Sequence, residues 1–215
     1  MSNEKKARKE KKEETPLHFW VTTIIGVLVA LVAVWGIKTF LIANDQVLGP
    51  SMQPTFENKD RIIATRQKSA TRNDIVIFNA PDQKNAQYIK RVIGLPGDTV
   101  QSINDVLYVN GKKVAEPYLN NKYKDARHKQ GYTYTNNFSL KTLADGSYYS
   151  SIYRDDQELL TEVKKTGKVP KGYYFVMGDH RNVSKDSRMI GFIKKDSLIG
   201  VVKLRYWPLN ALKTF

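Results

Sequence analysis

The feature that most constrains this chain is an uncharged segment near its N-terminus. No Asp, Glu, Lys or Arg occurs from Thr15 to Ile37, and the stretch from Phe19 to Ile37 is almost entirely apolar. At about 1.5 Å per residue, a helix of this length spans a hydrocarbon core of about 30 Å. Trp20 and Trp35 lie near its two ends, as aromatic residues at membrane interfaces do. We therefore predict a single transmembrane anchor over residues 17–41.

A cleavable signal peptide is the alternative for this segment. Such peptides have an apolar region of about 7–15 residues, followed by a small-residue cleavage site. The run here is longer, and Ile37 to Leu41 offers no such site, so we expect the anchor to be retained. Residues 1–16 form a basic tail, which the positive-inside rule places in the cytoplasm. The rest of the chain is then extracellular, held at the cell membrane.

Composition narrows the functional classes. The 215 residues leave room for an anchor and one or two compact domains. The absence of cysteine excludes disulfides, thiolate metal sites and cysteine-dependent catalysis. The formal net charge of +14 favours an anionic partner. Because no nucleic-acid-binding signature occurs, we assign this charge to a solvated surface near membrane lipid and expect no nucleic acid partner. We also expect no metal and no other cofactor.

Beyond the anchor, short apolar runs between turn-forming residues predict a mostly β fold. The runs are residues 61–64, 74–78, 88–93, 173–177 and 199–207. Asn110-Gly111 is typical of a tight hairpin turn. We assign residues 42–114 and 170–215 to one β core. Residues 115–169 are polar and rich in Tyr, Asn and Lys, and we predict that they form an inserted β-rich subdomain.

Ser51 and Lys90 are the candidates for hydrolytic chemistry. A serine hydroxyl needs a base to remove its proton, and a neutral lysine amine can serve. The reference pKa of lysine is about 10.4, so such an amine needs an apolar site that lowers its pKa. On a strand, Lys90 and Arg91 point to opposite faces, which keeps the Arg91 charge away from Lys90. Taken alone, each candidate is more commonly a turn serine or a solvated strand lysine.

The turn before Ser51 favours a catalytic role for the serine. Ser51 follows Gly49-Pro50, and a proline has no backbone N–H. The free backbone donor at this turn is therefore that of Ser51. A backbone donor next to a nucleophile is what an oxyanion hole needs.

A polar segment from Gly178 to Gly191 lies between apolar strands and supplies further candidates. Asp186 and Arg188 are spaced to pair across a turn. Ser184 is a candidate for orienting the lysine amine through a hydrogen bond, the role of the third group in a nucleophile–base site. Asp179 and His180 leave open a serine–histidine site in place of a serine–lysine site.

Together these features resemble the bacterial type I signal peptidases of the Gram-positive type. After the anchor come GPSMQPTF at 49–56, RNDIVIF at 72–78, YIKRVIGLPGD at 88–98 and GDHRNVSKDSRMIGFI at 178–193, in the family's order and approximate spacing. The resemblance implies a membrane-bound serine endopeptidase that uses a Ser-Lys dyad. Its substrates would be secreted preproteins, cut after small residues at the end of their signal peptides.

The resemblance also assigns roles to individual residues. It maps the nucleophile to Ser51, the general base to Lys90 and the lysine-orienting serine to Ser184. A structural ion pair near the site maps to Asp186 and Arg188. The implied fold is a β-rich catalytic core with a variable inserted β domain.

Two departures and two alternatives accompany the resemblance. Gly49 stands where many Gram-negative members have a serine that adds an oxyanion donor, and His180 stands where the family often has Asn.

One alternative function is that of a non-proteolytic or dedicated member that assembles pili or other surface structures. A non-proteolytic member would be expected to lack the serine or the lysine, and both are present. The other is a self-cleaving regulator, which needs a DNA-binding domain that residues 1–14 are too short to form.

Overall fold

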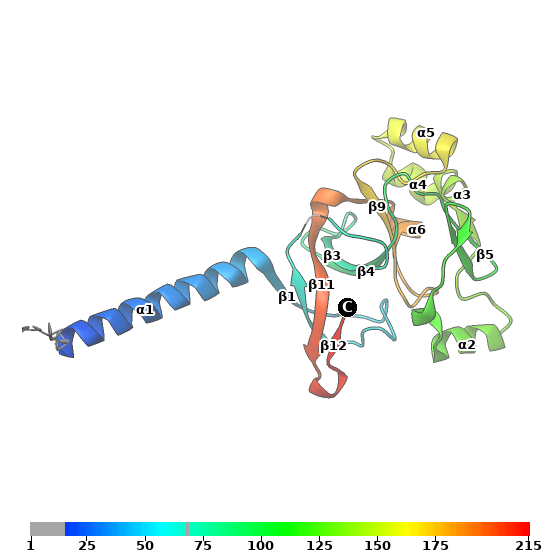
Figure 1. The fold of residues 1–215 in the computed structure, drawn as a ribbon. Coiled ribbons are helices and arrows are strands. Elements are labelled where there is room, and N and C mark those ends of the chain that lie inside the picture. The colour runs from blue at the N-terminus through cyan, green and yellow to red at the C-terminus, as the bar shows by residue number, and fades with distance from the viewer. Residues whose placement is uncertain (1–15, 68) are drawn as a thin grey trace, which may run out of the picture. The chain divides into compact units, whose positions relative to one another are not determined.

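The computed structural model describes residues 16–67 and 69–215 (Figure 1). The predicted cytoplasmic tail lies outside the described residues, apart from Pro16. Contacts within the chain define two compact units, Met1–Phe40 and Leu41–Phe215. Residues 115–169, predicted as an inserted subdomain, fall within the second unit together with the β core.

The N-terminal unit is dominated by one apolar helix. Helix α1 (Pro16–Gly36) continues into a π-helical turn, η1 (Ile37–Leu41). Phe19–Leu41 is long and apolar enough to cross a membrane. The hydroxyls of Thr22 and Thr23 donate to the Phe19 carbonyl at 3.0 and 2.8 Å, so these polar groups are satisfied inside the helix, as a hydrocarbon environment requires. The predicted anchor is therefore a candidate membrane span.

The second unit is built on an antiparallel eight-stranded sheet, which confirms the mostly β class. The strand order is β1-β2-β11-β3-β4-β9-β10, and β12 pairs with β11. The bounds are β1 (Ile42–Gln46), β2 (Arg61–Thr65), β3 (Ile75–Asn79), β4 (Gln87–Gly94), β9 (Tyr173–Met177), β10 (Ile193–Lys194), β11 (Leu198–Trp207) and β12 (Lys213–Thr214). All five predicted apolar runs form strands of this sheet.

Both faces of the sheet are covered, which explains the nearly continuous apolar runs. Within β3, Ile75 and Ile77 pack into one buried cluster, whereas Val76 and Phe78 pack into another. Alternate residues of a strand point to opposite faces, so a strand buried on both sides loses the polar half of its pattern. The short helix α6 (Ser187–Ile190) and the single-turn helices η3 (Lys195–Ser197) and η4 (Leu209–Ala211) connect the later strands.

A smaller, four-stranded sheet has the strand order β7-β6-β5-β8. Its strands are β5 (Val100–Ile103), β6 (Val106–Val109), β7 (Lys112–Lys113) and β8 (Phe138–Ser139). The predicted turn at Asn110-Gly111 joins β6 to β7, with Val109 opposite Lys112. That hairpin prediction is confirmed.

The prediction that residues 115–169 are rich in β structure is wrong. The segment holds the single-turn helix η2 (Pro117–Leu119) and helices α2 (Lys122–Lys129), α3 (Leu140–Ala144), α4 (Ser147–Ile152) and α5 (Gln157–Thr166), with only the two residues of β8 as strand. Several polar residues of this segment are helix caps. Asn121, Ser139 and Asp156 accept backbone N–H groups at the starts of α2, α3 and α5, and Gly167 ends α5 in a left-handed conformation.

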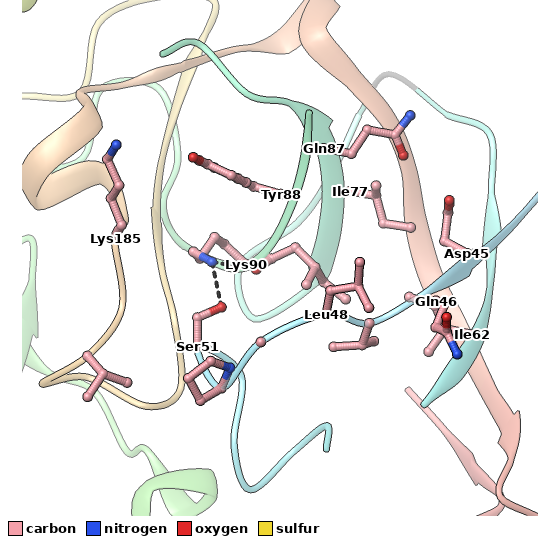
Figure 2. A pocket seen from close by; sticks show the side chains of 15 residues that line it. Asp45, Gln46, Leu48, Ser51, Ile62, Ile77, Gln87, Tyr88, Lys90 and Lys185 are labelled. Atoms are coloured by element: carbon pink, nitrogen blue, oxygen red, sulfur yellow. Dashed lines mark hydrogen bonds between the residues drawn. The ribbon is translucent and has the colours of Figure 1, made fainter. Parts of the chain in front are cut away.

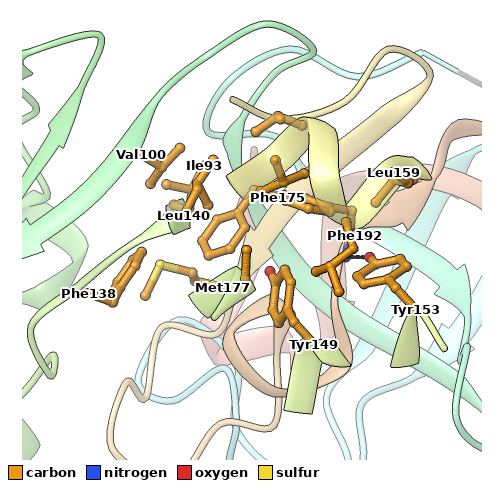
Figure 3. Close-up of a cluster of buried hydrophobic side chains, with 14 of the residues drawn as sticks. Ile93, Val100, Phe138, Leu140, Tyr149, Tyr153, Leu159, Phe175, Met177 and Phe192 are labelled. Atoms are coloured by element: carbon orange, nitrogen blue, oxygen red, sulfur yellow. Dashed lines mark hydrogen bonds between the residues drawn. The ribbon is translucent and has the colours of Figure 1, made fainter. Parts of the chain in front are cut away.

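Helices α3, α4 and α5 are held by a large apolar cluster shared with the main sheet (Figure 3). Leu159, Leu160 and Val163 of α5 are buried, at the spacing of one helix face. They join Phe175 of β9 and Phe192 in the same cluster. In Figure 1 the helices α3, α4 and α5 lie near β5 and β9, well away from β1 and β12.

Candidate active site

Ser51 and Lys90 meet in space although 39 positions separate them in the sequence. Lys90 is on β4, and Ser51 follows β1 in a turn. Lys90 Nζ lies 2.8 Å from Ser51 Oγ (Figure 2). It also donates to the Ile89 carbonyl at 3.0 Å. Lys90 is only 4% exposed. The structure therefore brings the predicted nucleophile and the predicted base into hydrogen-bond contact.

Burial changes the acid–base behaviour of the lysine. Loss of hydration lowers the pKa of Lys90 from 10.5 to about 8, although the negative charges of Asp186 and Asp179 act to raise it. With a pKa near 8, about one lysine in ten is neutral at pH 7, compared with about one in a few thousand at the reference pKa. The site thus supplies a substantial fraction of the free amine that proton transfer needs.

The turn that carries Ser51 is held in place by the apolar residues that follow it. Met52 and Phe56 have no exposed surface and pack into the cluster formed by β1, β2 and β3. The Phe56 N–H donates to the Met52 carbonyl at 2.9 Å. The apolar residues that follow Ser51 are therefore core residues that anchor the serine, and they leave its hydroxyl facing Lys90.

Arg91 lies on the opposite face of β4, as predicted. Its Nε and Nη2 bind Oδ1 and Oδ2 of Asp179 at 2.9 and 2.6 Å. The hydroxyl of Thr55 donates to the same Asp179 Oδ2 at 2.5 Å. One buried carboxylate therefore ties the nucleophile segment, strand β4 and the Gly178–Gly191 segment together.

His180 supports the backbone of the nucleophile turn. Its N–H donates to the Ser51 carbonyl at 3.1 Å, and its ring Nδ1 lies 3.2 Å from the Pro50 carbonyl oxygen. The Tyr123 ring of α2 packs against it, with centroids 4.3 Å apart. The ring faces Pro50 and Asp179 is bound by Arg91, so the hydrogen bonds that a serine–histidine site needs are not formed among the described residues.

Asp186 and Arg188 form the predicted ion pair. Arg188 Nη2 and Nε bind Asp186 Oδ2 and Oδ1, each at 2.8 Å. Burial acts to raise the pKa of Asp186, but the Arg188 guanidinium and the Gly178 N–H outweigh it and hold that pKa below its usual value. The Gly178 N–H donates to Asp186 Oδ2 at 3.0 Å, so the ion pair fixes the start of the polar segment.

The predicted hydrogen bond from Ser184 to the Lys90 amine is absent. The Lys90 amine contacts the Ser51 hydroxyl and the Ile89 carbonyl instead. Ser184 Oγ is buried and has no hydrogen-bond partner among the residues that the structure describes. Its hydroxyl lies against the backbone of Gly178, which places it beside the site with its hydrogen-bonding capacity unused.

The Ser51 N–H remains available as an oxyanion donor, as predicted. It donates to no acceptor in the described part of the chain. The Gly49 N–H, by contrast, donates to Asn58 Oδ1 at 3.1 Å. The Gly49 donor is therefore occupied, whereas the Ser51 N–H is free to bind an oxyanion.

A groove of about 410 Å³ opens beside the dyad. It is lined by Ser51 and Lys90, by residues 45–50, by Gln87, Tyr88 and Ile89, and by Ile62, Ile77, Val183 and Lys185 (Figure 2). Strand β4 pairs with β3 along residues 87–91, but β9 pairs with it only from Arg91 onward. The other backbone edge of Gln87–Lys90 is therefore free of strand partners, which suits the addition of an extended peptide.

Comparison with known proteins settles the family. Residues 20–207 match the family described as "Signal peptidase, peptidase S26". The chain belongs to this signal peptidase family. It is 39% identical over 194 residues to the signal peptidase IB of Staphylococcus aureus, covering 88% of this chain and 91% of that protein. It is 36% identical over 210 residues to the signal peptidase I P of Bacillus subtilis subsp. natto, covering 95% of this chain and 97% of the relative.

A solved structure also matches. The crystal structure of a signal peptidase I from Enterococcus faecalis V583 covers 62% of this chain and 96% of its own, with 36% identity and a TM-score of 0.47. Family membership makes this chain a peptidase that cleaves signal peptides, and its substrates are preproteins that carry them.

One group that supports this signal peptidase site gave no signal in the sequence. Arg181 is buried, and its guanidinium pairs with Glu116, lies 3.2 Å from the Tyr118 hydroxyl and 3.3 Å from Thr135 Oγ1. Its Nε also donates to the Gly178 carbonyl at 3.0 Å. The partners are 46 to 65 positions away in the sequence, so only the folded chain reveals that residues 115–135 brace the catalytic segment.

Replacing Gly178 by alanine is expected to damage both the fold and the site. A methyl group at Gly178 would overlap the Ser184 hydroxyl and the Ser51 carbonyl oxygen. Overpacking of this kind costs about 1–3 kcal/mol, and moving the Ser51 carbonyl displaces the nucleophile. Thermal unfolding and precursor cleavage measure the two effects. The double variant Gly178→Ala, Ser184→Gly removes one of the two overlaps and should recover part of the stability. A Gly178→Ala enzyme with wild-type stability and activity would contradict the packing argument.

Proposed function

We propose that this signal peptidase is a membrane-bound serine endopeptidase that uses Ser51 as nucleophile and neutral Lys90 as general base. The observation that carries the proposal is the buried Lys90 amine, 2.8 Å from the Ser51 hydroxyl. A general base must lie within about 2.6–3.2 Å of the proton it removes and must be unprotonated at the working pH. The contact meets the first condition, and the lowering of the Lys90 pKa to about 8 keeps a substantial fraction of the amine neutral near neutral pH, toward the second.

The catalytic cycle follows from these positions. Lys90 Nζ takes the Ser51 proton as Oγ attacks the scissile carbonyl, and the developing oxyanion accepts the Ser51 N–H. The resulting Lys90 ammonium gives its proton to the leaving amine, so the mature protein departs and the signal peptide stays on Ser51 as an acyl ester. The amine, neutral again, takes a proton from water as the water oxygen attacks the acyl carbon. The ester bond to Ser51 then breaks, the signal peptide leaves as a free carboxylic acid, and the Lys90 ammonium returns its proton to Ser51 Oγ.

The groove supports cleavage of an extended chain after small residues. A peptide paired with the free edge of Gln87–Lys90 presents alternate side chains toward the groove. The buried residues Val47, Ile62 and Ile77 provide apolar walls there. Large side chains fit poorly in a groove whose walls are core residues, which favours small residues next to the scissile bond.

The apolar helix supports a location at the membrane. Helix α1 and η1 would anchor the chain, with the basic residues before them kept in the cytoplasm. The catalytic unit would then work on the extracellular side, at the surface where preproteins emerge. An extracellular site also agrees with a peptidase that acts after its substrate has crossed the membrane.

The proposal is tested with the purified full-length chain in detergent or vesicles and a secreted precursor. We expect one cut, and N-terminal sequencing of the product should place small residues on the signal-peptide side of the cut. The same preparation carrying Ser51→Ala controls for a contaminating protease. Equal cleavage by both preparations, or a cut unrelated to the end of the signal peptide, would overturn the proposal.

We also propose that Ser184 orients Lys90 during turnover, with Asp186 and Arg188 fixing the segment that carries it. The unused, buried Ser184 hydroxyl beside Gly178 supports this role. We expect Ser184→Ala to lower kcat about tenfold or more with little change in KM. Because the hydroxyl has no partner to lose in the resting structure, stability should not fall. The distinguishing measurement is the pH profile, whose midpoint should shift in Ser184→Ala. A normal kcat with an unchanged midpoint would exclude the role.

A further inference from the structure

Asp45 places a carboxylate on an otherwise apolar wall of the groove. Strand β1 alternates, so Ala43, Asp45 and Val47 share one face. Ala43 and Val47 are buried in the core, whereas Asp45 is half-buried. Across the strand pair Asp45 stands opposite Ile62, and both line the groove with Ile77 (Figure 2). The Asp45 carboxylate therefore has apolar core side chains on one side and the groove on the other.

The Asp45 carboxylate has no partner within the described chain. It makes neither a hydrogen bond nor an ion pair there, and burial raises its pKa while the more distant charge of Arg66 acts to lower it. Three other polar groups of the groove, those of Lys90, Lys185 and Gln46, are engaged elsewhere. Lys90 contacts Ser51, Lys185 pairs with Asp82, and the Gln46 amide donates to the Lys59 carbonyl. A partly desolvated carboxylate without a partner is costly unless a cation reaches it.

We propose that Asp45 is a specificity-determining residue that binds a basic side chain, Lys or Arg, of the peptide in the groove. This inference rests on the proposed function of the groove as the site of the extended substrate. The length of chain between Asp45 and Ser51 limits where that side chain lies. Six residues span at most about 20 Å when fully extended. The basic residue therefore lies within about six positions of the scissile bond. The walls of the groove there are apolar, and the Asp45 carboxylate is the counter-ion that they offer to its charge.

The test is a peptide scan that uses the full-length enzyme. One cleavable peptide is varied, and Lys, Gln or Glu is placed in turn at each of the six positions on either side of the cut. We expect one position at which Lys raises kcat/KM over Gln by about 2- to 5-fold, the range of one partly exposed ion pair. Glu at that position should be cleaved more slowly than Gln. The Lys-to-Gln ratio is taken within each enzyme, so a general loss of activity cancels.

Variants of Asp45 make the test specific. Asp45→Asn should bring the Lys-to-Gln ratio to about one, and Asp45→Lys should favour Glu at the same position. The matched control is Asp155→Asn, which removes one negative charge at an exposed residue outside the groove and should keep the preference. If the wild type shows no Lys preference at any position, or if Asp45→Asn keeps it, the assignment is wrong. If no peptide and no precursor is cleaved at all, the proposed function itself fails.

Discussion

Replacing Ser51 by alanine is expected to lower kcat/KM for precursor cleavage by about 10⁴-fold or more. Loss of the nucleophile in a serine protease costs about 10⁶ in kcat, because the remaining groups of the site cannot form the acyl-enzyme. Here Ser51 Oγ is the hydroxyl that contacts the buried Lys90 amine. The substrate should still bind, since the groove walls are contributed by other residues, so binding of a fluorescent precursor and its cleavage are measured in parallel.

The control for this variant is Ser151→Ala, at an exposed serine of α4. It removes the same hydroxyl group far along the chain from the dyad and should leave cleavage unchanged. Among the residues that the structure describes, the Ser51 side chain makes one hydrogen bond, to Lys90, so Ser51→Ala should unfold within a few degrees of the wild type. An active Ser51→Ala enzyme that still cuts the precursor at the same bond would show that another group is the nucleophile.

The parts of the site that follow from local rules were predictable from the sequence. Strand alternation alone put Lys90 and Arg91 on opposite faces of β4, and the Arg91–Asp179 ion pair agrees. The turn before Ser51 was expected to leave its N–H free, because proline has no donor. Asp186 and Arg188 are two positions apart, close enough for their pairing to be inferred without a fold.

The parts that depend on long-range contacts were not predictable from one sequence. Thr55 and Asp179 are 124 positions apart, and Arg181 and Glu116 are 65 apart. No periodicity links such residues. The helices of 115–169 were missed for a different reason, since Asn, Ser and Asp favour both turns and helix N-caps. The packing of the apolar face of α5 against the shared core identifies the segment as helical and not as a series of turns.

Lys90→Met should remove activity while making the fold more stable near neutral pH. In the wild type the folded-state pKa of Lys90 is lowered from 10.5 to about 8, so below pH 8 folding must bury an ammonium group that the unfolded chain holds in water. At 1.36 kcal/mol per unit, the penalty is about 3 kcal/mol. A methionine of similar size carries no such penalty. The unfolding free energy of Lys90→Met at pH 7 should therefore exceed that of the wild type by up to about 3 kcal/mol, less the lost contacts with Ser51 and Ile89.

The lowered pKa of Lys90 determines the direction in which stability and cleavage each change with pH. The unfolded chain binds more protons than the folded chain between pH 8 and 10.5, so the wild type gains stability from this group as pH rises through that window. The advantage of Lys90→Met should be full below pH 8 and vanish near pH 10.5. Wild-type kcat/KM should rise about tenfold per pH unit below 8 and level off above it, because only the neutral amine takes the Ser51 proton. Urea unfolding and cleavage, each measured from pH 6 to 10, provide both curves.

The control is Lys171→Met, at an exposed lysine outside the groove, which should change neither the stability curve nor the cleavage curve. A Lys90→Met protein less stable than the wild type at pH 7 would mean that the buried amine stabilises the fold through its contacts, and that its burial carries no net cost. A flat activity profile through pH 8 would mean that its protonation does not limit cleavage.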